Sequence, residues 1–240
     1  MEPWLIFLLI AIPTVIIFLI IIAIYISKSN HDKGDYRDGG GKQVGSFGQT
    51  ATFATEAEVA GFQGEKFVNY HLRPLLRNDE YLLTNLLIPL RNGRTTEIDS
   101  VIISRKGIFC IETKNWAGQI YGNDNDEYWE QIYDDPYKEN RRPKNPVIQN
   151  ERHCSVLDHL FHGHFTVEGA VIFVNDSADY YVYSSSCYTV GQFKMYFRSL
   201  PETQLTIDEV EQVFQKLFKH LATPEQLERH KERINKQYNN

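Results

Sequence analysis

An aspartate, a glutamate and a lysine lie at the ends of two neighbouring apolar runs of the sequence. Asp99 stands near the start of the first run, and Glu112 and Lys114 close the second. The runs are rich in β-branched residues, and a short polar stretch ending in Gly107 joins them, so they predict a β-hairpin. Two carboxylates with a neighbouring lysine can hold a divalent cation and orient or deprotonate a water molecule beside it.

The register of this hairpin decides whether the charged side chains meet. If the isoleucines that flank the turn face each other, Asp99 lies directly opposite Glu112, with Cβ atoms about 4.5–5.5 Å apart. The same register puts Glu97 opposite Lys114, and alternation places all four side chains on one face of the sheet. Two carboxylates at that distance repel each other in a half-buried sheet, and a divalent cation between them would remove that cost.

An ordinary explanation of the same residues stays open. Charged residues at strand ends are usually solvated, and Glu97 and Lys114 could form a cross-strand ion pair. A bulge would also shift the register and send Asp99 to the other face. However, both runs are apolar on both faces, which predicts central strands that helices cover on both sides. Surface charge is a poor explanation in such a place.

The N-terminal residues predict a membrane anchor. Residues 4–26 form an almost unbroken apolar run without a charge, and about 20 residues suffice to cross a bilayer core. A cleaved signal peptide is the competing interpretation, but the run is too long for one and no small-residue cleavage site follows. Lysines and arginines follow the run, which favours a single-pass protein of the cell membrane with a cytoplasmic C-terminal domain.

Composition limits the remaining possibilities. The 240 residues carry a formal net charge of −6 and a pI near 5.8, so any binding to phosphate needs a local basic patch. Cys110, Cys154 and Cys187 are odd in number and lack metal-type spacing. They predict reduced thiols in a reducing compartment.

The pattern of elements predicts an α/β fold with a mixed central sheet flanked by helices. A helix over about 56–73, three strands, a helix that starts after Asn145 and runs to about Phe161, and a further strand follow one another. Residues 115–144 are a long polar and aromatic excursion between the third strand and the second helix. The expected parts of the chain are a transmembrane helix at 1–27, a flexible Gly-rich linker at 28–55, the domain with these elements at 56–175, and a largely helical C-terminal extension at 176–240.

The element order and the Asp99…Glu112-x-Lys114 spacing resemble the PD-(D/E)xK nuclease-like fold, and more narrowly the NERD (nuclease-related) domain. The resemblance covers about residues 57–175. Ile98 stands where the broader superfamily has Pro, which leaves the carboxylate beside it unaffected. The motifs that carry the resemblance are Gly64-Glu65, Thr96-Glu97-Ile98-Asp99, Gly107-Ile108-Phe109, Ile111-Glu112-Thr113-Lys114-Asn115-Trp116, Gly118-x-Ile120 and Asn145-Pro146…Gln149.

This resemblance implies a restriction-endonuclease-like αβββαβ core and metal-dependent hydrolysis of phosphodiester bonds. The expected substrate is nucleic acid, DNA more than RNA, and nucleases of this fold often cut duplexes as homodimers. Asp99, Glu112 and the backbone carbonyl of Thr113 would hold Mg²⁺ or Mn²⁺. Lys114 would hold the attacking water and stabilise developing negative charge.

The resemblance alone implies two further site residues. Glu65 is implied as a supporting acid from the first helix, and Gln149 is implied to point at the site from the second. Taken by themselves, they are a solvated helix glutamate and an ordinary surface glutamine.

A local basic stretch next to the second helix is a candidate substrate contact. It could bind phosphates while neighbouring aromatic residues stack on bases, or it could pair with the acidic residues that precede it. The basic residues are Lys138, Arg141, Arg142, Lys144 and Arg152, and the aromatic ones are Trp129, Tyr133 and Tyr137.

Two functions from different classes are therefore expected. The first is a membrane-anchored nuclease, which the complete set of Asp99, Glu112 and Lys114 favours. The second is a non-catalytic scaffold that binds nucleic acid or protein and retains the nuclease-like fold. The lack of overall basic charge and the additional C-terminal helices favour the scaffold.

Overall fold

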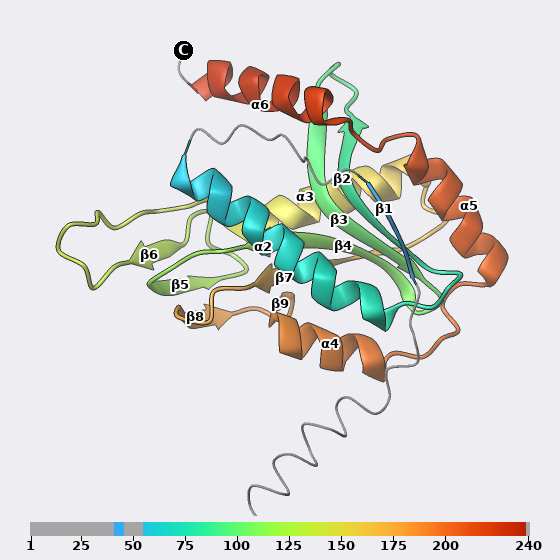
Figure 1. Cartoon of the computed structure of the whole chain (residues 1–240), viewed down its shortest axis with the longest axis horizontal. Helices are drawn as coiled ribbons and strands as arrows, with labels where there is room; N and C mark the ends of the chain where they lie inside the picture. The colour runs from blue at the N-terminus through green and yellow to red at the C-terminus, as the bar shows by residue number, and fades with distance from the viewer. Residues whose placement is uncertain (1–40, 46–54, 239–240) are drawn as a thin grey trace, which may run out of the picture. The chain divides into compact units, whose positions relative to one another are not determined.

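The structure is a computed structural model, and it describes residues 41–45 and 55–238 (Figure 1). The transmembrane helix expected at residues 1–27 lies outside these ranges, as does most of the expected linker. Within the described ranges, no helix combines the length and the apolar character needed to cross a membrane.

A mixed six-stranded sheet forms the centre of the fold, in the order β1-β2-β3-β4-β7-β9. Its middle strands are antiparallel, whereas the pairs β1–β2, β4–β7 and β7–β9 are parallel. This confirms the expected α/β class and mixed sheet. The strands are β1 Lys42–Val44, β2 Tyr81–Pro89, β3 Thr95–Ser104, β4 Gly107–Lys114, β7 Val167–Phe173 and β9 Cys187–Thr189.

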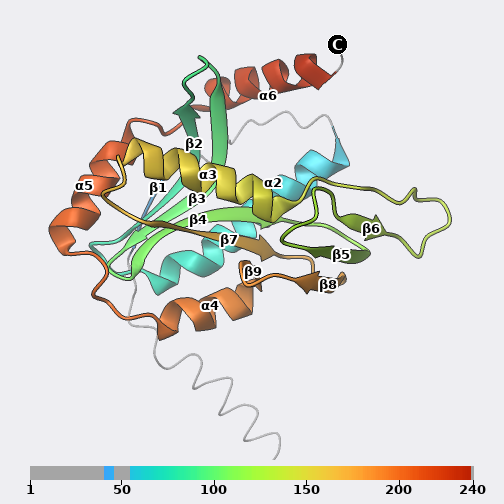
Figure 2. The same ribbon diagram turned by 180° about the vertical axis from the view of Figure 1, so that it is seen from behind.

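Helices cover both faces of this sheet, as Figures 1 and 2 show. Helices α2 (Glu56–Leu72) and α4 (Val190–Ser199) contribute residues to one apolar core cluster, and α3 (Pro146–Leu160) and α5 (Ile207–Phe218) contribute to the other. Strands β3 and β4 supply side chains to both clusters, so they are central strands, as their apolar residues predict. A final helix, α6 (Pro224–Tyr238), follows α5.

The predicted hairpin has the predicted register. Ile103 pairs with Ile108, and the pairs continue through Val101 with Cys110. Gly107 supplies the turn with a φ of 137°, a backbone conformation that favours glycine. The buried Cys110 carries a free thiol, as do the other two cysteines, in agreement with the prediction of reduced thiols.

Strands β2 and β3 change their side-chain alternation at one point. Leu83 and Leu86 pack into the same core cluster, although strict alternation would put them on opposite faces. Asn85 between them has a left-handed backbone with a φ of 57°, and β3 shifts in the same way at the facing residue, Asp99. Alternation alone therefore does not place Glu97 on the face of Glu112, contrary to the expectation.

A second sheet occupies part of the stretch 115–144 that the sequence predicts only as an excursion. Its order is β6-β5-β8, formed by β5 (Gln119–Asn123), β6 (Glu130–Ile132) and β8 (Asp179–Tyr183). Trp129 is fully buried beneath it and stacks on Phe173 at a centroid distance of 6.1 Å. Residues beyond 175 thus supply β8 to this sheet and β9 to the main one.

Side-chain caps set the ends of the helices. Thr55 and Glu58 form a capping box at the start of α2, so this helix begins at Glu56 and not later. Its end passes into a short 3₁₀ helix at Arg73–Leu75, which contains Pro74. Thr206 and Glu209 form a capping box at the start of α5, in the extension predicted to be largely helical, whereas α4 has no counterpart among the predicted elements.

Candidate active site

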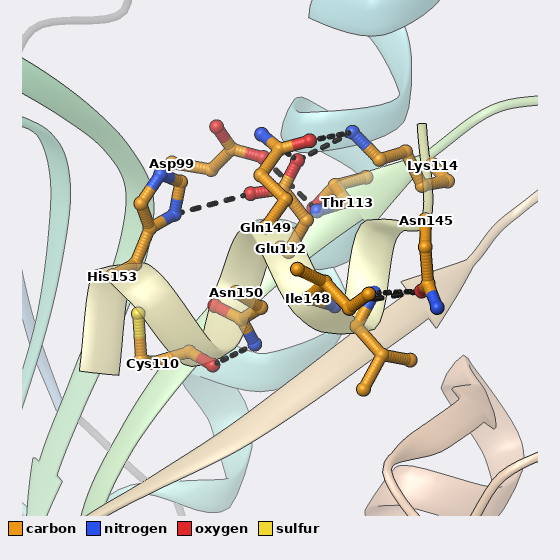
Figure 3. A network of polar contacts seen from close by, with 11 residues as sticks. Asp99, Cys110, Glu112, Thr113, Lys114, Asn145, Ile148, Gln149, Asn150 and His153 are labelled. Atoms are coloured by element: carbon orange, nitrogen blue, oxygen red, sulfur yellow. Dashed lines mark hydrogen bonds and ion pairs between the residues drawn. The ribbon is translucent and has the colours of Figure 1, made fainter. Parts of the chain in front are cut away.

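The site begins where the β3–β4 ladder ends. The last backbone pair is Ser100 with Ile111, one residue before Asp99 and Glu112 would face each other. Beyond this pair a side chain replaces the backbone as the hydrogen-bond acceptor, because the Oδ2 atom of Asp99 accepts the backbone N–H of Thr113 at 2.9 Å. Figure 3 shows the two carboxylates within one polar network. The hairpin register thus brings together the two acidic residues that the sequence predicts.

Glu112 is the centre of this network. The residue is 2 % exposed, and its Oε1 atom accepts from Lys114 Nζ at 2.5 Å and from Gln149 Nε2 at 2.9 Å. Lys114 Nζ also donates to Gln149 Oε1 at 3.3 Å. The lysine therefore pairs with Glu112, and the described residues contain no ion pair between Lys114 and Glu97.

His153 is a site residue that the sequence reasoning missed. Its Nδ1 atom lies 3.4 Å from Oε2 of Glu112, close enough for an ion pair but without hydrogen-bond geometry. His153 is 8 % exposed and lies one helical turn after Gln149 on α3. The i, i+4 spacing from Gln149 is the signal that could have found it.

The N-cap of α3 fixes the helix that carries Gln149 and His153. The Oδ1 atom of Asn145 accepts the N–H of Val147 at 2.8 Å, while Nδ2 donates to three backbone carbonyls of residues 123–126. Pro146 follows at the first helical position. The motif Asn145-Pro146…Gln149 therefore ties the start of α3 to the loop after β5 and aims two side chains at Glu112.

A glycine lets α2 approach the end of β4. A Cβ atom at Gly64 would stand 3.1 Å from Asn115 Cβ and 3.1 Å from Val174 Cγ2. Asn115 Nδ2 donates to the backbone oxygen of Ala60 at 2.8 Å, which fastens the helix in this position. Glu65 follows Gly64 and is partly buried.

Burial and neighbouring charges shift the pKa values of Asp99, Glu112 and Lys114 by different balances. Burial, together with the neighbouring Glu112 and Glu65, holds the pKa of Asp99 well above its usual range. Burial also acts to raise the pKa of Glu112, but Lys114 and His153 outweigh it and the pKa falls below the usual value. Burial likewise opposes the charge of Lys114, whereas Glu112 and Asp99 raise its pKa. An ionised Glu112 beside a protonated lysine is the favoured pair.

Glu65 and Glu97 add two carboxylates to those of Asp99 and Glu112. These four residues are called the acidic group. Burial, Glu97 and Glu112 raise the pKa of Glu65 to about 7, against the lowering effects of Lys231 and Lys114. Burial and Glu112 raise the pKa of Glu97, while Lys231 and His153 lower it. Glu65 therefore holds a proton more readily than an ordinary glutamate, as a supporting acid would.

The donor set fits a hard divalent cation held mainly by water and two carboxylates. The buried Oε2 of Glu112 and Oγ1 of Thr113 have no hydrogen-bond partner, and carboxylate oxygens are the ligands that Mg²⁺ and Mn²⁺ prefer. Across the described ranges, no three His, Cys, Asp or Glu side chains are grouped to enclose a metal ion. Mg²⁺ is commonly bound through only one or two carboxylates.

The basic stretch before α3 is exposed, but one of its expected aromatic partners is not. Trp129 belongs to the core and cannot stack on a base, whereas the Tyr137 side chain is 95 % exposed. Arg141, Arg142 and Arg152 make no ion pair with the preceding acidic residues within the described part of the chain. The alternative that the two runs pair with each other therefore has no ion pair in its favour at these three arginines. Figure 2 shows the loop between β6 and α3 projecting beyond the start of α3.

The fold is a mixed α/β domain whose site brings two carboxylates together with a lysine and a glutamine. The family model NERD, described as a nuclease-related domain, matches residues 60–174, from within α2 to the residue after β7. This segment, a little under half of the chain, is therefore similar to a nuclease-related domain over nearly the range that the motifs predict.

One curated protein is similar to part of this chain. The chain is 34 % identical over 100 residues to an uncharacterized protein of Bacillus anthracis, which covers 42 % of this chain and 46 % of that protein. The match therefore spans less than half of the relative's length. No solved structure matches the chain significantly.

Proposed function

We propose that this protein is a metal-dependent nuclease that hydrolyses phosphodiester bonds in nucleic acid, DNA more than RNA. One observation carries the proposal. Glu112 is buried and accepts from both Lys114 and Gln149 beside a second carboxylate. A buried charged group of this kind is costly to stability, and its chemistry matches that needed for phosphodiester hydrolysis.

Each residue of the site has a place in this reaction. Asp99, Glu112 and the backbone carbonyl of Thr113 would hold Mg²⁺ or Mn²⁺. When bound, the cation supplies charge neutralisation on the phosphate and a more acidic water. Lys114 orients the attacking water and stabilises the negative charge that develops on the phosphate oxygens. Gln149 fixes the lysine through its own carbonyl oxygen.

Glu65 and His153 support this arrangement from opposite helices. With its pKa raised to about 7, Glu65 can hold or release a proton near neutral pH at the edge of the site. His153 lies beside the Glu112 oxygen that has no hydrogen-bond partner, so it restrains the rotation of that carboxylate.

The proposal places this nuclease on the cytoplasmic side of the cell membrane. The apolar residues 4–26 would form a single-pass anchor, and the basic residues after them would keep the C-terminal domain in the cytoplasm. A homodimer would let two such sites act on the two strands of a duplex.

The second candidate is a non-catalytic scaffold that binds nucleic acid or protein. The observation in its favour is electrostatic, since the chain carries a net charge of −6 and several carboxylates surround the site. Such a surface repels a polyanion unless cations or local basic residues compensate.

Cleavage assays on the full chain in detergent separate the two candidates. Labelled single- and double-stranded DNA and RNA are incubated with Mn²⁺, with EDTA, and with the variants Lys114→Ala and Lys219→Ala. The nuclease predicts metal-dependent cutting that is lost in Lys114→Ala and kept in Lys219→Ala, which removes an exposed lysine at the end of α5. A folded protein that cuts none of the four substrates would leave the scaffold as the better explanation.

A further inference from the structure

The small sheet of β5, β6 and β8 has one face toward the core and one face toward solvent. Ile120 and its partner Tyr180 contribute to the apolar cluster around Trp129. Paired residues share a face, and the face alternates along a strand, so Tyr121 and its partner Tyr181 lie on the opposite side. This side is called the outer face. Figures 1 and 2 show the sheet at the end of the molecule away from α5.

Tyrosine rings gather on the outer face. The rings of Tyr121 and Tyr181 stack at a centroid distance of 4.7 Å with an interplanar angle of 7°. Tyr183 lies two residues further along β8 on the same face, and it is 82 % exposed, while Tyr181 is 49 % exposed. Aromatic side chains that are grouped and exposed in this way mark an interaction surface.

Carboxylates border these rings on the same face. Glu130 is the partner of Tyr121 across the β5–β6 pair, and Asp179 is the partner of Gln119 across the β5–β8 pair. Asp134 accepts from Gln119 Nε2 at 3.4 Å. All three carboxylates are exposed, and none of them forms an ion pair with any residue in the part of the chain that the structure describes.

The rings and the carboxylates together select the charge of a partner. The face of an aromatic ring attracts a cation, and exposed carboxylates repel a polyanion such as nucleic acid. An arginine suits both kinds of group, because its planar guanidinium stacks on an aromatic ring and donates to a carboxylate. The compact ammonium group of a lysine lacks this planar stacking. The outer face therefore fits arginine better than lysine.

We propose that the outer face binds an arginine-rich segment of a partner protein. Guanidinium groups stack on Tyr181 and Tyr183 and pair with Asp179. Alternate residues of a strand lie about 7 Å apart, a span that an arginine stacked on Tyr181 bridges to the carboxylate beside it. The binding surface is independent of the proposed nuclease, because no member of the acidic group belongs to the small sheet.

Peptide binding to the full chain in detergent tests the proposal. The probe is a fluorescein-labelled peptide of alternating arginine and serine, followed by fluorescence anisotropy. In two reference peptides, lysine or uncharged citrulline replaces arginine, and both should bind more weakly. Losing one exposed cation–π contact weakens binding about twofold to fivefold. The double variant Tyr181→Ala, Tyr183→Ala should therefore weaken binding of the arginine peptide roughly fivefold to twenty-fivefold.

Matched variants separate the outer face from the rest of the acidic surface. Tyr181→Phe keeps the ring and should keep binding, and Tyr70→Ala, which removes a 75 % exposed tyrosine on α2, should leave it unchanged. Asp179→Asn and Asp208→Asn change the net charge equally, but only Asp179→Asn should weaken binding. That loss should shrink as KCl is raised, because salt screens exposed charges.

Several results would overturn this inference. They are absence of peptide binding to the wild-type protein, equal binding of the arginine and citrulline peptides, and equal binding by the wild-type protein and the double tyrosine variant. Labelled oligothymidylate is measured in parallel. If the double variant loses binding to this single strand but not to the peptide, the outer face binds nucleic acid instead. Equal melting temperatures of the variants show that altered folding is not the cause.

Discussion

At the scale of single residues, Glu112 is held more firmly than its position at a strand end suggests. Lys114 comes from its own strand, whereas Gln149 and His153 come from α3, so two elements must pack correctly before the carboxylate is oriented. If Glu112 holds a cation as proposed, removal of one of these supporting contacts should lower metal affinity or activity about tenfold to hundredfold.

The raised pKa of Glu65 makes stability depend on pH. A glutamate in the unfolded chain ionises near 4.5, whereas burial raises the pKa of folded Glu65 to about 7. Between these values the folded protein binds more protons than the unfolded chain, so this residue lowers the free energy of unfolding as the pH rises. Glu65→Gln cannot ionise, and its melting temperature relative to wild type should therefore increase through this window.

The measurement is the melting temperature of both proteins without metal at about pH 5 and about pH 8. The difference between variant and wild type should favour the variant more at the higher pH. Groups that do not interact with Glu65 are common to both proteins and cancel in the difference. Asp99 does not cancel, because the charge of Glu65 adds to burial and Glu112 in raising its pKa, but its contribution changes the difference in the same direction. A difference that stays constant between the two pH values would contradict the burial of Glu65 beside Glu97.

At the scale of elements, two glycines of α2 test how closely this helix must approach β4. Gly64→Ala should lower the free energy of unfolding by about 1 kcal/mol, because overpacking against Asn115 and Val174 exceeds the gain in helix propensity. At Gly61 nothing lies within 4 Å of an added Cβ, so Gly61→Ala should stabilise by about 0.5–1 kcal/mol. Urea unfolding of both variants measures the two signs, and equal effects would mean that the close approach is unimportant.

The elements also show what can be read from the sequence. The hairpin register and the start of α3 after Asn145 depend on residues within a few positions of one another, so local patterns predict them. The pairing of β5 with β8 joins residues about 60 positions apart, and short polar strands carry no local signal for it. For the same reason His153 was missed, because it reaches the site only through tertiary packing. The family resemblance supplied Glu65 and Gln149, which local patterns alone would not.

At the scale of the whole molecule, a bound cation should change the stability of the folded state. Without metal, Asp99→Asn should be at least as stable as wild type, because burial and Glu112 disfavour the ionised aspartate. With Mn²⁺ at about a hundred times its dissociation constant, the wild-type protein should gain about 2.7 kcal/mol. The variant should lose most of this gain.

Melting temperatures with and without Mn²⁺ measure both effects. Asp208→Asn, which changes an exposed aspartate in the first turn of α5, should keep the full metal-dependent increase. The same increase in Asp99→Asn would show that Mn²⁺ binds somewhere other than the proposed site.

Both sheets contain a strand that lies beyond the end of the segment that matches the NERD family. That segment stops at residue 174, yet the outer edge of β7 is covered by β9 and that of β5 by β8, both of which come later in the chain. A protein cut at that boundary would expose two open strand edges, which are templates for aggregation. The segment that matches the family is thus shorter than the two sheets it contributes to, and the residues after it shield both strand edges from pairing with other chains.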